Sequence, residues 1–159
     1  MMLELVTRPA FHICGYATET TLEGNDGDIA ALYRDFFETG KEHTLLRLPG
    51  CQNGYYGLEW YTEGHQSFFY LLGKAVDETA DTPAGAVIKH IPAARYAVAE
   101  MPAGRNLVEA WTEFFYTGIP GAGYAPNAEH GFYFEYYPED VHGRCELWTP
   151  VIPASKETP

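Results

Sequence analysis

The sequence FYFEYY at residues 132–137 predicts a central β-strand, because it sets one carboxylate among strand-favouring aromatic residues. Alternate residues of a strand point to opposite faces, so Glu135 shares its face with Tyr133 and Tyr137. A carboxylate on such an apolar strand is costly to bury unless another group compensates its charge. An organic cation held by the carboxylate and the ring faces is one such group. A solvated sheet face with strand-favouring tyrosines is the alternative.

Composition sets the broad class of the protein. The 159 residues fit one domain, and 46% hydrophobic with 20% charged residues is usual for a soluble globular chain. A net charge of −12 argues against a nucleic-acid-binding surface, which needs clustered Lys and Arg. It suits cationic or neutral ligands, or a basic protein partner, better. Aromatic residues at 15%, including 12 Tyr and 9 Phe, favour an aromatic-lined pocket or interface.

The sequence also indicates where the protein works. No apolar run reaches membrane-spanning length, and the first residues lack the basic and apolar segments of a signal peptide. Cys14, Cys51 and Cys145 are widely spaced and form no CxxC pair. They are typical of reduced thiols, so we expect a cytoplasmic protein without a membrane segment.

Two helices are expected among the strands. Asp28 is placed to cap a helix that runs to about Thr39 and stops at Gly40. Asn106 is placed to cap a second helix, with a glutamate three residues later in capping-box position. The segment Gly118–Pro120 is expected to end this second helix.

The strands and helices fall into two similar halves, at about residues 3–78 and 86–152. Each half is predicted to read strand, helix, strand, strand, and Pro9 and Pro92 occupy matching positions. A unit this small buries little apolar surface alone, so the halves should pack together and leave a cleft at their junction. A turn at residues 63–66 should join two strands as a hairpin. The expected strands are residues 3–21 (a pair or one long bent strand), 54–61, 68–76, 87–98, 132–137 and 144–152.

The order of these segments resembles the GyrI-like effector-binding domain family, which includes the ligand-sensing domains of certain multidrug-responsive transcription regulators. The resemblance extends over roughly residues 3–152 and implies a pseudo-twofold α+β fold of two strand-helix-strand-strand units. The segments that carry it are the early strand ending at Gly15, the helix ending at Gly40, residues 56–58, 69–76, 91–98 and 107–115, and the late strand 134–137.

The resemblance also implies a site. In family members that bind drugs, the Glu of the late aromatic strand lies in an aromatic cleft and meets cationic ligands, and Glu135 is the matching residue. Because the similar segment starts at residue 3, a DNA-binding unit is not expected, and the chain looks like a stand-alone member. Stand-alone relatives are implied to bind small molecules, to hydrolyse reactive cyclopropane-containing compounds, or to inhibit DNA gyrase.

The candidate ligand-binding residues follow from both lines of reasoning. Glu59 is the first-half counterpart of Glu135, and one face of its strand should border the cleft. Core packing is the alternative for Tyr56, Trp60 and Trp111. No metal set is expected, because the six His lack ligand-like spacing, and no cofactor motif is present. The predicted ligand-binding residues are Glu135, Tyr133, Tyr137, Tyr56, Trp60 and Trp111.

Three functions remain open at this point. A binding module would hold a flat, apolar and preferably cationic molecule in the aromatic cleft, with Glu135 selecting the charge. An enzyme would use the same Glu135 as a catalytic general acid or base against a strained electrophile, because burial raises a carboxyl pKa. An inhibitor of a basic protein such as a gyrase would use the acidic surface. Binding is ranked first and hydrolysis second.

Overall fold

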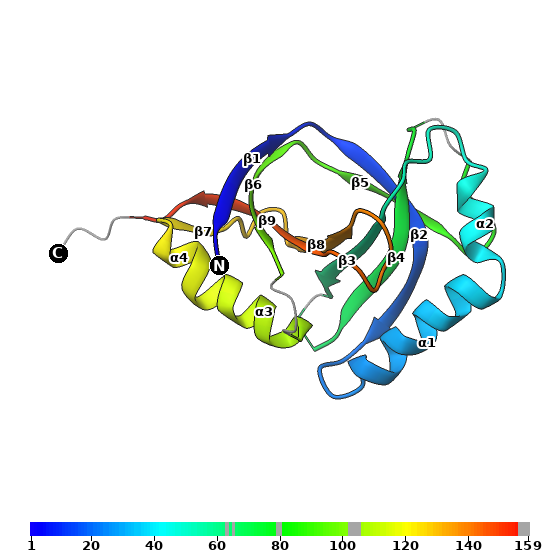
Figure 1. Cartoon of the computed structure of the whole chain (residues 1–159), viewed down its shortest axis with the longest axis horizontal. Coiled ribbons are helices and arrows are strands. Elements are labelled where there is room, and N and C mark those ends of the chain that lie inside the picture. The colour runs from blue at the N-terminus through cyan, green and yellow to red at the C-terminus, as the bar shows by residue number, and fades with distance from the viewer. Residues whose placement is uncertain (63, 65, 79–80, 102–105, 156–159) are drawn as a thin grey trace.

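One large antiparallel sheet forms the body of the protein (Figure 1). The computed structural model describes residues 1–62, 64, 66–78, 81–101 and 106–155. Within them the strands follow one another across the sheet as β1-β6-β9-β8-β3-β4-β2-β5, and β7 pairs with β9 beside this path. The strands are β1 (Leu3–Arg8), β2 (Phe11–Thr20), β3 (Tyr55–Tyr61), β4 (Phe68–Val76), β5 (Val87–Ile91), β6 (Ala94–Glu100), β7 (Tyr124–Pro126), β8 (Phe132–Tyr137) and β9 (Glu146–Pro153).

The strand order is symmetric about the β3–β8 pair at the centre of the sheet. At each edge of the sheet the outermost strand comes from the other half of the chain. Strand β1 of the first half pairs with β6 of the second, and β5 of the second half pairs with β2 of the first. Pro9 and Pro92 occupy equivalent places, each between two consecutive strands, where the missing N–H of proline breaks the ladder. Each half therefore begins with two strands: residues 3–21 form the pair that was one of the two expectations, and the single extended run expected at 87–98 is divided into β5 and β6. The α+β fold class is confirmed, and the residue limits of the halves stay a prediction.

Two helical segments cover one face of the sheet, which we call the helix face. In Figure 1, α1 lies below β2 and β4, and the segment from α3 to α4 lies below β6 and β9. Buried side chains fix both contacts: Phe36 of α1 packs on one half of the sheet, and Phe114 packs on the other. The helices are α1 (Asn25–Glu38), α2 (Lys41–Leu46), α3 (Leu107–Glu113), the π-helical η1 (Phe114–Gly118) and α4 (Ile119–Gly121).

The opposite face, which we call the inner face, folds around a core of its own. Ile91 of β5 and Val98 of β6 share this core, although their strands lie near opposite ends of the strand order. The sheet therefore curls until its two ends meet over the inner face. At the centre of this core Leu58 of β3 lies opposite Phe134 of β8, and both side chains are almost completely buried.

The first helix differs from its prediction at its start. It begins at Asn25 rather than after Asp28, which lies within the first turn. The Asp28 carboxylate accepts a hydrogen bond of 2.7 Å from the Thr20 hydroxyl at the end of β2, so it ties the helix to the sheet instead of capping it. Gly40 ends the helix in the left-handed conformation (φ 83°), as expected. The short helix α2 that follows was not predicted.

The second helix begins as predicted and continues further. The Asn106 side chain accepts a hydrogen bond of 2.8 Å from the Glu109 N–H, which confirms the cap. The prediction that Gly118–Pro120 ends the helix is wrong. Gly118 keeps right-handed backbone angles, and Pro120 is in the first turn of α4, directly after the π-helical turn η1.

Two further expectations concern the middle and the surface of the chain. Strands β3 and β4 pair as the expected antiparallel hairpin, but the predicted turn at 63–66 includes residues 63 and 65, which lie outside the described residues. Among the described residues, no helix has the length and apolar character needed to span a membrane.

Candidate functional site

The candidate site lies at the centre of the sheet, where β3 and β8 pair. In their register Gly57 lies opposite Glu135, and Glu59 lies opposite Tyr133. All four residues are on the helix face, because they sit at alternate positions of both strands. Glu59 and Glu135 are therefore diagonal neighbours, a relation that places Cβ atoms roughly 7–8 Å apart. The strand pairing brings two acidic side chains together under the two helices.

The Glu135 carboxylate is completely buried and is held by neutral donors. Its Oε1 atom accepts a hydrogen bond of 2.8 Å from the Tyr70 hydroxyl of β4. Its Oε2 atom accepts one of 3.0 Å from the Trp111 indole N–H of α3. The Tyr33 hydroxyl of α1 lies 2.6 Å from that of Tyr70 and extends the network to the other helix. Glu135 is thus bonded to one helix directly and to the other through one tyrosine.

Burial raises the pKa of both carboxyl groups. For Glu135 the loss of solvation comes first and the nearby Glu59 second, and together they raise its pKa well above the ordinary value, against hydrogen bonds from Tyr70, Trp111 and Tyr137. Burial also raises the pKa of Glu59 to about 7, and a hydrogen bond from Tyr133 opposes this shift. Since two close carboxylates resist carrying charge together, the pair retains a proton near neutral pH.

Aromatic rings surround the two carboxyl groups. The Trp111 ring stacks on Phe115, with centroids 5.2 Å apart, and meets Tyr133 edge-on at 4.7 Å. Phe115 also contacts Tyr133 at 5.2 Å, so the three rings form one cluster. Tyr137 is buried on the same face next to Glu135. Ring faces are electron-rich, so this cluster provides both apolar contact and cation–π attraction.

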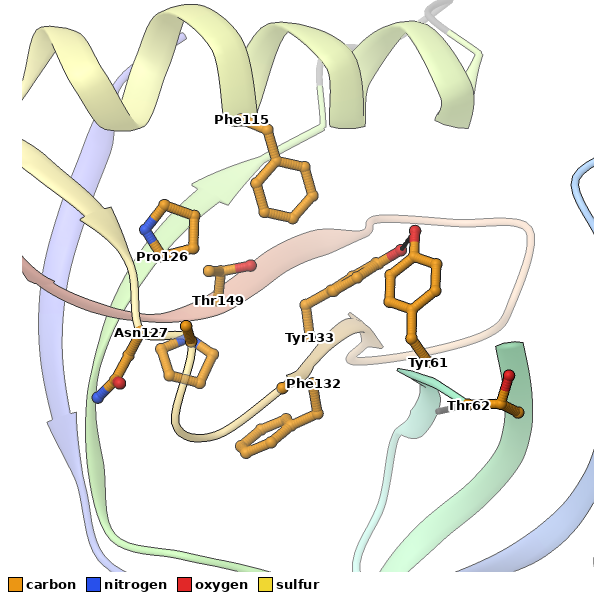
Figure 2. A pocket seen from close by; sticks show the side chains of 11 residues that line it. Tyr61, Thr62, Phe115, Pro126, Asn127, Phe132, Tyr133 and Thr149 are labelled. Carbon is orange, nitrogen blue, oxygen red and sulfur yellow. Dashed lines mark hydrogen bonds between the residues drawn. The ribbon is translucent and has the colours of Figure 1, made fainter. Parts of the chain in front are cut away.

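A cavity of about 400 Å³ adjoins this cluster, and Tyr133 forms part of its wall (Figure 2). Its volume lies within the range of about 300–1,000 Å³ that small-molecule pockets occupy. Phe115 projects into the cavity from the helix above it. Tyr61 approaches from the neighbouring strand β3, and its hydroxyl lies 3.4 Å from that of Tyr133. Thr149, a residue only 2% exposed, also lines the cavity, and its hydroxyl has no hydrogen-bond partner among the described residues.

The structure brings some of the predicted ligand-binding residues together and not others. Glu135, Tyr133, Tyr137 and Trp111 meet on the helix face, as described above. Tyr56 and Trp60 point to the inner face, because they alternate with Gly57 and Glu59 along β3. The Tyr56 ring packs between aromatic residues of the inner core, and its hydroxyl accepts a hydrogen bond of 2.7 Å from Arg8.

Several residues of the site escaped the sequence analysis. The sequence places Tyr70 in a strand and Phe115 in a helix, but no pattern assigns either residue to the site. No pattern points to Thr149. Alternation assigns Tyr70 to one face of its strand, but only the pairing of β3 with both β4 and β8 places that face next to Glu135. Among the described residues, no group of three or more His, Cys, Asp or Glu is arranged to hold a metal ion.

Comparison with known proteins gives the family. The family model for Cass2, the integron-associated effector binding protein, matches residues 4–151. The chain therefore belongs to the Cass2 family of effector-binding proteins, and the resemblance to GyrI-like domains is confirmed. A search of curated proteins found no significant match.

Three solved structures share the fold at low sequence identity. SAV2435 bound to tetraphenylphosphonium is 16% identical, with a TM-score of 0.71 over 96% of this chain and 94% of that one. The integron cassette protein VCH_CASS2 of Vibrio cholerae is 14% identical, with a TM-score of 0.63 over 94% and 95%. The EcmrR C-terminal domain is 10% identical, with a TM-score of 0.64 over 96% and 98%.

Proposed function

We propose that this protein binds aromatic organic cations, with Glu135 as the residue that selects positive charge. The proposal rests mainly on a fully buried carboxylate whose described hydrogen-bond partners, Tyr70, Trp111 and Tyr137, are all neutral. A protein that buries such a group without a fixed cation leaves room for a ligand to supply the charge. The membership in an effector-binding family and the ligand named for SAV2435 support the same class.

The two parts of the site divide the work of recognition. The carboxyl pair of Glu59 and Glu135 attracts the charged centre, and a cation that arrives replaces the proton held between them. The cavity next to Tyr133 and Phe115 receives an aromatic group. Ring-to-cation contacts are worth about 0.5–2 kcal/mol each. With apolar burial they give about −8 kcal/mol, which is micromolar affinity and suits a binder of many related cations.

The test compares a cation with a neutral compound of similar shape. Calorimetric titration with tetraphenylphosphonium should give saturable binding to the wild type, and the neutral triphenylphosphine oxide should bind more weakly. Glu135→Gln keeps the side-chain shape but removes the charge, so we expect about a tenfold to hundredfold loss of affinity for the cation and under about twofold for the neutral compound.

The matched control is Glu19→Gln, which removes the same charge from an exposed position of β2. It should leave both affinities unchanged. An equal loss for the cation and the neutral compound in Glu135→Gln would show that the substitution damages the pocket rather than its charge selection. That result, or the absence of saturable cation binding, would refute the proposal.

Hydrolysis of a strained small molecule is the second candidate, and the pKa of about 7 at Glu59 favours it. A carboxyl group that titrates near neutral pH is suited to general acid–base catalysis, because it both takes and returns a proton. Mass spectrometry of the protein mixed with cyclopropane-containing electrophiles tests this function directly. A hydrated product that forms with the wild type and not with Glu59→Gln or Glu135→Gln would establish an enzyme. If the compounds remain unchanged, hydrolysis is excluded for them and binding is the function that remains.

A further inference from the structure

A second cavity, of about 370 Å³, opens on the inner face of the sheet and shares Tyr61, Gly131 and Phe132 with the wall of the first cavity. Leu58 and Trp60 of β3 and Ile91 of β5 form apolar walls, together with Phe132 of β8. Strands β3 and β5 are separated by β4 and β2 in the strand order, so they line one cavity only because the sheet curls. Trp60, one of the predicted ligand-binding residues, lines this cavity.

The polar groups of this cavity are basic. The Lys89 ammonium lies 4.0 Å from the centroid of the Trp60 ring, and within the described residues it forms no ion pair. His90 and His130 also line the cavity, and each imidazole ring supplies at least one N–H donor. None of its described lining residues is acidic, in a chain with 22 Asp and Glu against 10 Lys and Arg. The charge of this cavity is thus opposite to that of the candidate cation site.

We infer that this cavity is a separate binding site for a flat aromatic carboxylate. The ring of such a ligand packs against Phe132, Ile91 and Leu58, and its carboxylate reaches the Lys89 ammonium. Hydrogen bonds between a carboxylate and an ammonium are stronger than those between neutral groups, and apolar walls strengthen them further by excluding water.

The geometry around Lys89 suits this role. Trp60 stacks on Phe69 with centroids 5.2 Å apart and an interplanar angle of 16°, so its ring is fixed. The fixed ring orients Lys89 through cation–π attraction, which leaves the other directions around the ammonium for a ligand. The Nδ1 atom of His90 contacts Nδ1 of His12 at 2.6 Å, so this side of the His90 ring is occupied and Lys89 is the main group for an anion.

The experiment is an NMR titration of the whole protein with 2-naphthoate. The neutral 2-naphthalenemethanol serves as the matched ligand, and the indole N–H signals report where each compound binds. We expect saturable binding of 2-naphthoate with a Kd of roughly 0.1–1 mM, a shift of the Trp60 signal, and much weaker binding of the alcohol. Lys89→Met keeps the aliphatic stem but removes the charge, and it should raise the Kd about tenfold.

Two variants separate this site from other effects of charge. Lys89→Arg keeps the charge and should hold the Kd within about threefold of the wild type. Lys41→Met removes a lysine that pairs with Asp35 on the helical side and should leave the Kd unchanged. Equal affinities of wild type and Lys89→Met for 2-naphthoate, or equal affinities of 2-naphthoate and the alcohol for the wild type, would overturn the inference.

Glu135→Gln distinguishes the two sites. It should leave binding of 2-naphthoate unchanged, because Glu135 lies on the helix face. A loss of 2-naphthoate binding in this variant, or a shift of the Trp111 signal in place of the Trp60 signal, would place the anion in the cation site and refute a separate site. A failure of cation binding would leave the 2-naphthoate result intact, so the two proposals stand or fall independently.

Discussion

Gly57 and Glu135 face each other across the central strand pair, and the absence of a side chain at Gly57 makes room for the carboxylate network. A Cβ at this position would come within 2.1 Å of the Tyr70 hydroxyl oxygen and 2.8 Å of the Glu135 Oε1 atom. Both atoms belong to the hydrogen bond that holds the carboxylate, so a methyl group must displace it. This glycine is therefore part of the candidate site although it contributes no functional group.

We predict that Gly57→Ala lowers the free energy of unfolding by about 1–3 kcal/mol, the usual cost of overpacking a buried site. It should also weaken cation binding, because Tyr70 and Glu135 lose their present geometry. Urea denaturation and calorimetric titration measure the two effects. The matched control is Gly27→Ala in the first turns of α1, where a Cβ meets nothing within 4 Å. This control should be neutral or slightly stabilising, because alanine favours helices. Equal stability of the two variants would contradict the packing argument.

The pH dependence of stability is predicted from Glu59 and Glu135. Their pKa values are raised in the folded protein, to about 7 for Glu59, and return to ordinary values near 4.5 when the chain unfolds. Between these values the folded state binds more protons than the unfolded state, so the contribution to stability falls as pH rises. This contribution is fully present below about pH 4.5, and the part due to Glu59 is lost by about pH 7–8. At about 1.4 kcal/mol for each pKa unit, Glu59 accounts for at most roughly 3.5 kcal/mol.

Urea denaturation from pH 5 to pH 8 isolates the contribution of Glu59. The free energy of unfolding should decrease over this range less steeply in Glu59→Gln than in the wild type, because the amide does not titrate. Glu19→Gln, on the exposed side of β2, should keep the wild-type slope. Identical slopes in Glu59→Gln and the wild type would show that Glu59 ionises freely in the folded protein.

At the scale of the elements, α3 carries Trp111 to Glu135, and the start of this helix determines whether the indole donor is in place. Asn106 accepts the backbone N–H of Glu109 and caps a helix of only seven residues. The first turn of this helical segment depends on its cap, because its N–H groups have no acceptor within the helix. The same helix joins η1 and α4 without a break, which keeps Phe115 close to Trp111.

We predict that Asn106→Ala destabilises the protein by about 1 kcal/mol and weakens cation binding. Both effects arise because the first turn of α3 loses its acceptor and Trp111 loses its fixed position. Thermal denaturation and calorimetric titration measure them. Asn106→Asp retains an acceptor at the cap and should behave like the wild type. A loss of stability in Asn106→Ala without any change in affinity would show that the helix cap does not influence ligand binding.

At the scale of the whole molecule, the net charge of −12 acts on approaching ligands before they reach the pocket. A strongly negative protein attracts cations over distances of about the Debye length, roughly 10 Å at 0.1 M salt. The association rate of a cation should therefore fall several-fold between about 0.02 M and 0.3 M salt, because screening weakens this attraction.

Stopped-flow tryptophan fluorescence with tetraphenylphosphonium measures this rate, and the neutral triphenylphosphine oxide supplies the reference. The association rate of the neutral compound should be nearly independent of salt, and dissociation of the cation should change little. Equal salt dependence for both compounds would show that long-range attraction does not contribute to ligand capture.

Local sequence patterns were enough to predict most of the strands, the two main helices, the start of α3 at Asn106, and the face that Glu135 shares with Tyr133 and Tyr137. These features follow from local rules: alternation along a strand, helical spacing of apolar residues, and side-chain capping. Local rules failed where backbone context matters. Gly118 and Pro120 continue a helix because a π-helical turn and a first-turn position make both tolerable.

Which residues meet in the site depends on how the strands pair and curve. Alternation shows that Tyr56 and Trp60 share one face of β3, but it does not show which face borders Glu135, and that depends on the register between β3 and β8. Tyr70 joins Glu135 because β4 pairs with the other edge of β3. Lys89 joins Trp60 because the sheet curls and brings β5 over its inner face. Strand pairing and sheet curvature connect residues far apart in the chain, so no local pattern in the sequence records them.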